Sequence, residues 1–372
     1  MDPPLPEGLC STSCARVILT NINAGHRGNI KLLHNDCMSL KAPTTPDSQW
    51  RTEEEATVDH VMIMDNTSDI TMLTLSGLSG ETTNRMVIFS LTLLCYFLIL
   101  MVNISLVLTI ILDHNLHQPM YIFVCNLCLN ALYGTAGFYP KFLLDLLYSR
   151  HVISFGGCVV QSLVIYSSVC IEYSILALMA YDRYAAICRP LDYHSLMKKQ
   201  NVCLLTCFSW IIPFLNLLVA LIKTSTLKLC GSHIDKLYCA SWLIVKIACS
   251  PGLTNAALSY ITIIIYFFHF VYIFMSYFYL VRTCVKSIES KRKFMQTCLP
   301  HLMTLLNVTV AVLFDVMFMR FGSADVSPMI KNALSLEFLI IPPIVNPLIY
   351  GIILTKIRNR IRFILFHKKV TS

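Results

Sequence analysis

The chain contains few charged residues. Only 13% of its 372 residues are Asp, Glu, Lys or Arg, whereas about 25% is usual for soluble domains. Hydrophobic residues make up 56% of the chain, and its mean hydropathy is +0.64. This composition indicates a protein that folds in lipid. The formal net charge of +8 does not indicate a nucleic-acid partner, because in a membrane protein the distribution of basic residues over the loops is what matters.

The sequence also lacks the patterns that carry common enzyme chemistry. It has no Cys/His set at zinc spacing, no phosphate-binding glycine loop and no nucleophile paired with a base. We therefore expect neither an enzyme nor a resident cofactor. No internal repeat is visible, which argues against the repeat architecture of many transporters.

Long hydrophobic runs dominate the rest of the chain. A membrane-spanning helix needs about 20 mostly apolar residues, and seven segments within 86–354 meet this requirement. They are Met86–Leu112, Tyr121–Leu147, Cys158–Cys188, Val202–Ile222, Ala256–Val281, Cys298–Met319 and Met329–Leu354. Several prolines fall inside them, and neighbouring helices of a bundle can satisfy the carbonyls that proline frees. The sequence thus predicts an all-α membrane protein with a seven-helix bundle.

Basic residues set the orientation of this bundle. Lys198 and Lys199 lie in one connection, five Lys or Arg side chains lie in 282–293, and six more follow Leu354. Because cytoplasmic loops carry the excess of Lys and Arg, the N-terminus is predicted outside. The tail, 355–372, alternates basic and apolar residues at helical spacing, which predicts a short amphipathic helix on the lipid of the inner leaflet.

Residues 1–63 are polar and contain no signal-peptide apolar core. They can be a disordered extension or the product of a mis-assigned start. We favour the second interpretation, because Met64 opens MDNTSD, which looks like a receptor N-terminus. Residues 64–85 are then the extracellular N-terminus, with a glycosylation sequon at Asn66. The sequons at Asn103 and Asn307 fall inside predicted helices and are not expected to be glycosylated.

One motif connects these features to a known family. MAYDRYAAICRPLDY, Met179–Tyr193, resembles the signature at the end of the third helix of odorant receptors, a branch of the rhodopsin-like G-protein-coupled receptors. Four further motifs follow the family's order. They are PMYIFVCNLCLN (119–130), SYFYLVRTCVKS (276–287), KFMQTCLPHL (293–302) and PPIVNPLIY (342–350). The resemblance extends from about Asn66 to the C-terminus, and NLCLNALYGTAGFYPKF (126–142) looks most like the branch found in fish.

The resemblance implies a receptor that binds a small odorant within the bundle and activates a stimulatory olfactory heterotrimeric G protein, which raises cyclic AMP. Its implied location is the plasma membrane of olfactory cilia. Arg183 would pair with Asp182 at rest and help to receive the G protein after activation. The alternative is that Asp182 and Arg183 form an interfacial ion pair that only fixes the depth of the helix in the membrane. The implied switch residues are Asp182, Arg183, Tyr184, Tyr277, His301, Asn346, Pro347 and Tyr350.

Two other function classes are less consistent with the sequence. A rhodopsin-like receptor for an endogenous amine or peptide is the runner-up, but an amine receptor would have an aspartate where Ile165 stands. A transporter would show repeat symmetry and several charges at mid-membrane, and neither is prominent.

Four of the sixteen cysteines lie near the predicted outer face: Cys158, Cys230, Cys239 and Cys249. That compartment permits disulfides, and four cysteines allow three pairings. The resemblance implies Cys158 with Cys239 and Cys230 with Cys249.

Glu172 is the deepest charge of the third predicted helix, and an acid at that depth is functional by default. The resemblance implies a cation site in which this acid pairs with an aspartate of the second helix. Here that position is Ala131, with Asn130 beside it. Glu172 therefore either holds a sodium ion with fewer ligands or is protonated.

The ligand cavity is expected between helices, as in other bundles. The candidate lining residues are Ile165, Tyr166, Val169 and Cys170 of the third helix, Ile261 and Ile265 of the fifth, Val312 of the sixth and Glu337 of the seventh. Glu337 is either a solvated acid near the outer interface or a polar anchor for the ligand. The identity of the odorant cannot be deduced from the sequence.

Overall fold

A computed structural model describes residues 70–76, 82–148, 151–250, 253–284, 298–321 and 328–367. The predicted N-terminal extension 1–63, the sequon at Asn66 and the end of the tail lie outside these ranges. So do most of the basic residues of 282–293.

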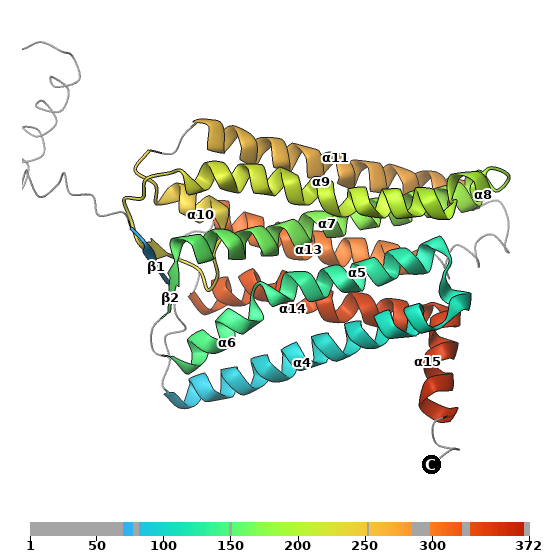
Figure 1. Ribbon diagram of the computed structural model, residues 1–372, viewed down its shortest axis with the longest axis horizontal. Coiled ribbons are helices and arrows are strands. Elements are labelled where there is room, and N and C mark those ends of the chain that lie inside the picture. Colours follow the sequence, from blue (N-terminus) through green and yellow to red (C-terminus); the bar gives the residue numbers. More distant parts are fainter. Residues whose placement is uncertain are drawn as a thin grey trace, which may run out of the picture. The chain divides into compact units, whose positions relative to one another are not determined.

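Seven spans run side by side and form the predicted helix bundle (Figure 1). Six of them are long and apolar enough to cross a membrane, and the remaining one has a shorter apolar run, Leu299–Asp315, among the described residues. The spans are α4 (Thr82–Leu112), α5 (Pro119–Ala136) continued by α6 (Tyr139–Leu147), α7 (Phe155–Cys188), α9 (Lys199–Ser225), α11 (Leu253–Cys284), α13 (Leu299–Phe321) and α14 (Pro328–Ile353). The prediction of a seven-helix membrane bundle is confirmed.

The second span differs from its prediction, because Tyr121–Leu147 is not a single helix. It breaks between α5 and α6, and α6 starts with Pro140 in its first turn, where the missing N–H of proline costs nothing. Gly137 lies at the break. A Cβ atom there would lie 2.7 Å from Cγ1 of Val164, so only glycine lets α7 approach this closely.

A small three-stranded sheet, which the sequence analysis did not predict, lies at the outer end of the bundle. Strand β1 (Met72–Leu75) pairs antiparallel with β2 (Val152–Ser154) and parallel with β3 (His233–Ile234). Leu73 and Leu75 point inward and pack with the Cys158 and Cys239 side chains. The sheet therefore joins the segment before α4 to the two loops that precede α7 and α11, and α10 (Ser241–Lys246) follows β3 in the second of these loops.

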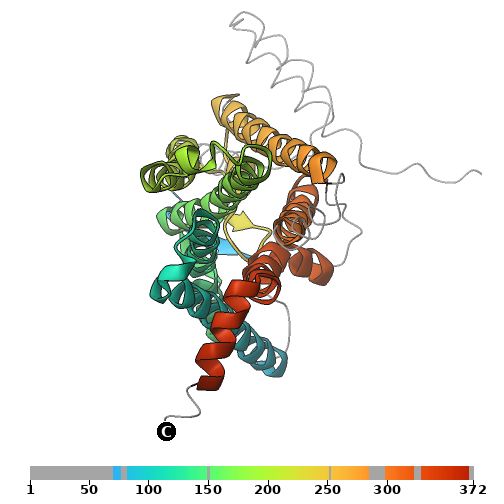
Figure 2. The ribbon, with the colours of Figure 1, turned by 90° about the vertical axis from the view of Figure 1, so that its right-hand side faces the viewer.

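The inner end of the bundle carries short helices. A 3-10 turn, η2 (His114–Leu116), follows α4, and α8 (Tyr193–Leu196) follows α7. The predicted amphipathic helix is α15 (Thr355–His367), which turns away from α14 (Figure 1). Ile357 of this helix is fully buried, and Arg360 Nε lies 3.1 Å from Asp113 Oδ2 in the turn after α4. Figure 2 looks along the bundle from this end, with α15 in front.

Candidate ligand-binding site and inner switch

A cavity of about 420 Å³ lies between α7, α11 and α13. Ligand pockets in proteins commonly measure roughly 300–1,000 Å³. Its wall is almost entirely apolar and rich in aromatic rings. The lining residues are Tyr166, Val169, Cys170, Tyr173, Thr262, Ile263, Tyr266, Phe267, Phe270, Thr309, Val312, Leu313, Asp315 and Phe338.

Four of the predicted ligand residues line this cavity, namely Tyr166, Val169, Cys170 and Val312. Ile165 has no exposed surface and instead belongs to a buried hydrophobic cluster. Glu337 is half-buried on α14 and is absent from the cavity wall.

The placement of Ile261 and Ile265 in the pocket is wrong. They are 49% and 37% exposed on α11, whereas Thr262 and Tyr266 line the cavity. Successive helical residues differ by about 100° in direction, because a turn takes 3.6 residues. An error of one residue in helical phase therefore moved the predicted pair from the wall of the cavity to the outer surface of the helix.

Asp315 lines the cavity and was not among the residues predicted from the sequence. It is 3% exposed on α13 and is the one carboxylate in the described wall of the cavity. An acid in an apolar helix was a usable signal, since ionisable side chains within membrane helices are rarely incidental.

Lys236, from the loop before α11, pairs with the Asp315 carboxylate above the cavity. The hydroxyl of Tyr238 donates to Asp315 Oδ1 at 2.8 Å, and Tyr166 belongs to the same electrostatic cluster. Burial lowers the pKa of Lys236 below its ordinary value, and the carboxylate of Asp315 opposes that shift. A buried charge pair of this kind is tolerable because each ion has a partner.

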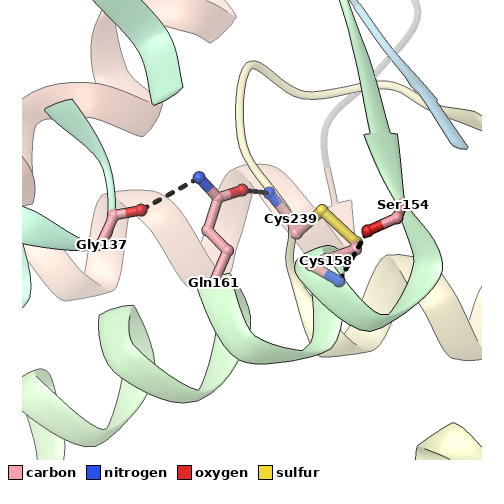
Figure 3. Close-up of a disulfide and its surroundings, with 6 residues drawn as sticks. Gly137, Ser154, Cys158, Gln161 and Cys239 are labelled. Carbon is pink, nitrogen blue, oxygen red and sulfur yellow. Dashed lines mark hydrogen bonds between the residues drawn. A yellow bond between two sulfur atoms is a disulfide. The ribbon is translucent and has the colours of Figure 1, made fainter. Parts of the chain in front are cut away.

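The loop that supplies Lys236 is fixed to α7. The structure joins Cys158 to Cys239 and Cys230 to Cys249, which is the pairing that the resemblance implies. Figure 3 shows Gln161 beside the first disulfide: its amide oxygen accepts from the Cys239 N–H at 2.9 Å, and its Nε2 donates to the Gly137 carbonyl at 3.0 Å. Gln161 thus ties the loop to the break between α5 and α6.

At the inner end of α7, Arg183 and Asp182 form an ion pair. Arg183 Nε donates to Asp182 Oδ2 at 2.9 Å, and the Tyr193 hydroxyl donates to Oδ1 at the same distance. Asp182 has no exposed surface. Both of its oxygens are therefore engaged, and Arg183 is held against its own helix. Tyr193, the first residue of α8, was not among the predicted switch residues.

Other predicted switch residues lie toward the same end of the bundle. Tyr277 on α11 is buried, and its hydroxyl has no hydrogen-bond partner among the described residues. The fully buried Tyr350 places its hydroxyl 3.4 Å from Nδ1 of His301. Tyr184 is half-buried. The structure thus brings Tyr350 and His301 into contact at this end of the bundle.

Asn346 connects this region to Glu172. Its Nδ2 donates to Glu172 Oε1 at 2.9 Å, and its Oδ1 accepts from Asn307 Nδ2 at 3.1 Å. Two small cavities, of about 20 and 10 Å³, adjoin Glu172, and Ala131 lines both. The amide of Asn346 is thus used by side chains, whereas the Pro343 carbonyl of α14 accepts from Asn103.

The sequons inside the bundle are structural. Asn103 lies within α4 with no exposed surface, and Asn307 lies within α13. Their amides make the hydrogen bonds just described, so neither is available to a glycosyl transferase.

Comparison with known proteins agrees with this architecture. A family profile described as olfactory receptor matches residues 92–368. The chain is 31% identical over 290 residues to olfactory receptor 4M1 of Mus musculus, which covers 77% of this chain and 91% of the relative. It is 32% identical over 304 residues to olfactory receptor 4E1 of Homo sapiens, covering 79% and 92%. It is 30% identical over 320 residues to olfactory receptor 13D1 of Homo sapiens, covering 85% and 91%. The chain is a multi-pass membrane receptor, not an enzyme, and belongs to the olfactory receptor family.

Proposed function

We propose that this receptor binds a small odorant in the cavity between α7, α11 and α13 and activates a stimulatory heterotrimeric G protein that raises cyclic AMP. The observation that carries the proposal is the apolar cavity in the outer half of the bundle, in a chain whose inner end holds the Asp182–Arg183 pair. The proposed location is the plasma membrane of olfactory sensory cilia.

Arg183 is the proposed coupling residue. In the resting arrangement its guanidinium is held by Asp182, and release would let it meet the G protein. A ligand shifts such an equilibrium only by binding one arrangement better than the other. The cavity lies on α7, α11 and α13, so a ligand can bias the packing of the same helices that carry Asp182, Tyr277 and His301.

The test is a screen of an odorant panel by cyclic AMP in transfected cells, with surface level measured in parallel. Arg183→Ala should abolish the response to any agonist that is found and keep the surface level. Lys223 is an exposed cation in the last turn of α9. The control variant is Lys223→Ala, which should respond normally. An Arg183→Ala receptor that signals normally would remove this residue from the mechanism.

We further propose that a sodium ion binds beside Glu172. Among the described residues, no group of three or more His, Cys, Asp or Glu side chains is placed to hold a metal. One observation fits a monovalent ion: Asn103 Oδ1 is buried with no hydrogen-bond partner among the described residues and lines the same small cavity as Glu172. The carboxylate and this amide oxygen would be its ligands.

Replacing sodium chloride with choline chloride should lower the thermal midpoint of the purified receptor and leave Glu172→Gln unaffected. Equal behaviour of the two proteins would show instead that Glu172 is protonated and binds no ion.

A further inference from the structure

We propose that ligands reach the cavity laterally from the membrane, through an opening between α11 and α13. The receptor would then select lipophilic molecules that partition into the bilayer. The proposal deepens the proposed function, since it takes the cavity between α7, α11 and α13 as the ligand site. It follows from which walls of the cavity are closed and which are open.

The outer end of the cavity is closed by the loop before α11. Tyr238, Cys239 and Ala240 have no exposed surface, and Lys236 is 5% exposed. The disulfide to Cys158, the Gln161 hydrogen bond and the ion pair with Asp315 fix this loop to α7 and α13. The three-stranded sheet adds a further layer. Access from the aqueous side would require breaking a buried ion pair, and removing one partner from such a pair is costly.

The side of the cavity is open where α11 faces α13. Ile263, Phe267 and Leu313 line the cavity and are also 44%, 60% and 55% exposed. Side chains that border the cavity and the outer surface at once mark a passage between the two. Helix α13 packs chiefly on α14, and α11 packs chiefly on α7 and α9, so the α11–α13 boundary is the loosely packed wall. This boundary lies within the candidate membrane span of α11 and the shorter apolar run of α13, Leu299–Asp315.

The chemistry of the passage fits a lipophilic ligand. The side chains at the opening are isoleucine, phenylalanine and leucine, which favour apolar groups. Asp315 is the polar end of the cavity, and its carboxylate oxygens accept hydrogen bonds. The expected ligand class is therefore an apolar molecule with one hydrogen-bond donor, such as a hydroxyl, that reaches Asp315 while its body contacts the aromatic rings.

A free cysteine in the cavity wall can report whether a reagent reaches the cavity. Cys170 is a free, buried cysteine in the cavity wall. Cys203 and Cys207 are free and exposed on α9, where a lipid-dissolved reagent meets them directly. The purified full-length receptor in bilayer nanodiscs is treated with a lipid-soluble N-alkylmaleimide or with a permanently charged thiosulfonate, and peptide mass mapping gives the rate at each cysteine.

The maleimide should modify Cys170, Cys203 and Cys207, whereas the charged reagent should leave Cys170 unmodified. A bulkier ring in the opening, Leu313→Trp or Phe267→Trp, should slow modification of Cys170 by roughly tenfold, since the indole ring would fill the passage and further packing into filled space is unfavourable. The matched controls are Leu306→Trp on α13 and Phe274→Trp on α11, which are exposed by 66% and 60% and lie outside the cavity wall. They should keep the native rate, and Cys203 should react equally in every variant.

Three results would overturn lateral access: modification of Cys170 by the charged reagent, failure of the maleimide to modify Cys170 while it modifies Cys203, or an unchanged Cys170 rate in both opening variants. This measurement needs neither an agonist nor a G protein. Its result therefore does not depend on whether the proposed signalling function is correct. A receptor without any cyclic AMP response can still show lateral labelling, and a responsive receptor can lack it.

Discussion

Asn103 of α4 donates a hydrogen bond of 2.8 Å to the carbonyl of Pro343 in α14. That carbonyl lies four residues before Pro347, which has no N–H to donate to it. The amide of Asn103 therefore replaces the helical hydrogen bond that proline removes. The same Nδ2 also donates within its own helix, to the Ile99 carbonyl at 2.9 Å.

A second proline of α14 is compensated in the same way. Pro343 leaves the Leu339 carbonyl without its usual donor, and the hydroxyl of Tyr139 in α6 lies 3.4 Å from that carbonyl. Two neighbouring spans thus stabilise the proline-containing helix, as expected where lipid offers no hydrogen bonds.

Replacing Asn103 with alanine should destabilise the receptor. Leaving the Pro343 carbonyl buried without a donor costs about 1–3 kcal/mol, which should lower the thermal midpoint by several degrees. The control is Ser105→Ala, an exposed residue of the same helix that bonds only within α4, and it should change the midpoint little. Circular dichroism of the purified receptor in detergent is the measurement. Equal midpoints for Asn103→Ala and the native protein would contradict the role of this hydrogen bond.

Much of the bundle could be predicted from sequence because span length and hydropathy follow directly from the thickness of a bilayer. The helical phase was harder, and Ile261 and Ile265 show why. A helix such as α11 is apolar on every side, so no amphipathic pattern separates its lipid face from its cavity face. The role of Asn103 was also hidden, because its partner carbonyl lies 240 residues further along the chain. The β1–β3 sheet was missed for a related reason: its strands have two to four residues, too few to show a period.

Tyr193→Phe should raise basal signalling. Its hydroxyl holds Asp182 Oδ1 at 2.9 Å, and a hydrogen bond to a charged group stabilises by about 1.5–3 kcal/mol. Losing it weakens the resting Asp182–Arg183 arrangement. Basal cyclic AMP per surface receptor is the measurement, with the exposed Tyr148→Phe as the control. Basal activity no higher than that of the native receptor would show that Tyr193 does not hold the resting state.

The two disulfides should differ in their contribution to stability. They close chain segments of 81 and 19 residues, for which loop entropy predicts about 4.5 and about 3 kcal/mol. Cys158→Ser should therefore lower the thermal midpoint and the surface level more than Cys230→Ser. The reverse order would show that local packing of the loop, and not chain entropy, determines the effect.

Acid should weaken the attachment of α15 only well below neutral pH. The Asn115 backbone N–H donates to Asp113, lowers the pKa of its carboxyl and leaves it ionised to pair with Arg360. A carboxyl whose pKa is lowered by folding contributes stability that is present above its unfolded value of about 3.9 and is lost as the pH falls through the folded value. The midpoint difference between the native protein and Asp113→Asn should be constant from about pH 7 to about pH 5 and shrink below about pH 4. A difference that disappears already near pH 6 would exclude this carboxyl as the cause.

Adjacent residues of α11 should differ sharply in their effect on ligand potency. Tyr266 lines the cavity, whereas Ile265 faces outward. Truncating a buried aromatic ring that a ligand covers removes roughly 1.5–3 kcal/mol of apolar contact, so Tyr266→Ala should weaken potency by about tenfold or more. Ile265→Ala should leave potency unchanged, because its side chain meets lipid with or without ligand. Dose–response curves of cyclic AMP for one agonist from the panel, corrected for surface level, compare the two. A larger loss for Ile265→Ala would mean that α11 is rotated about its axis by one residue, and the cavity wall would then be the one that Ile261 and Ile265 predict.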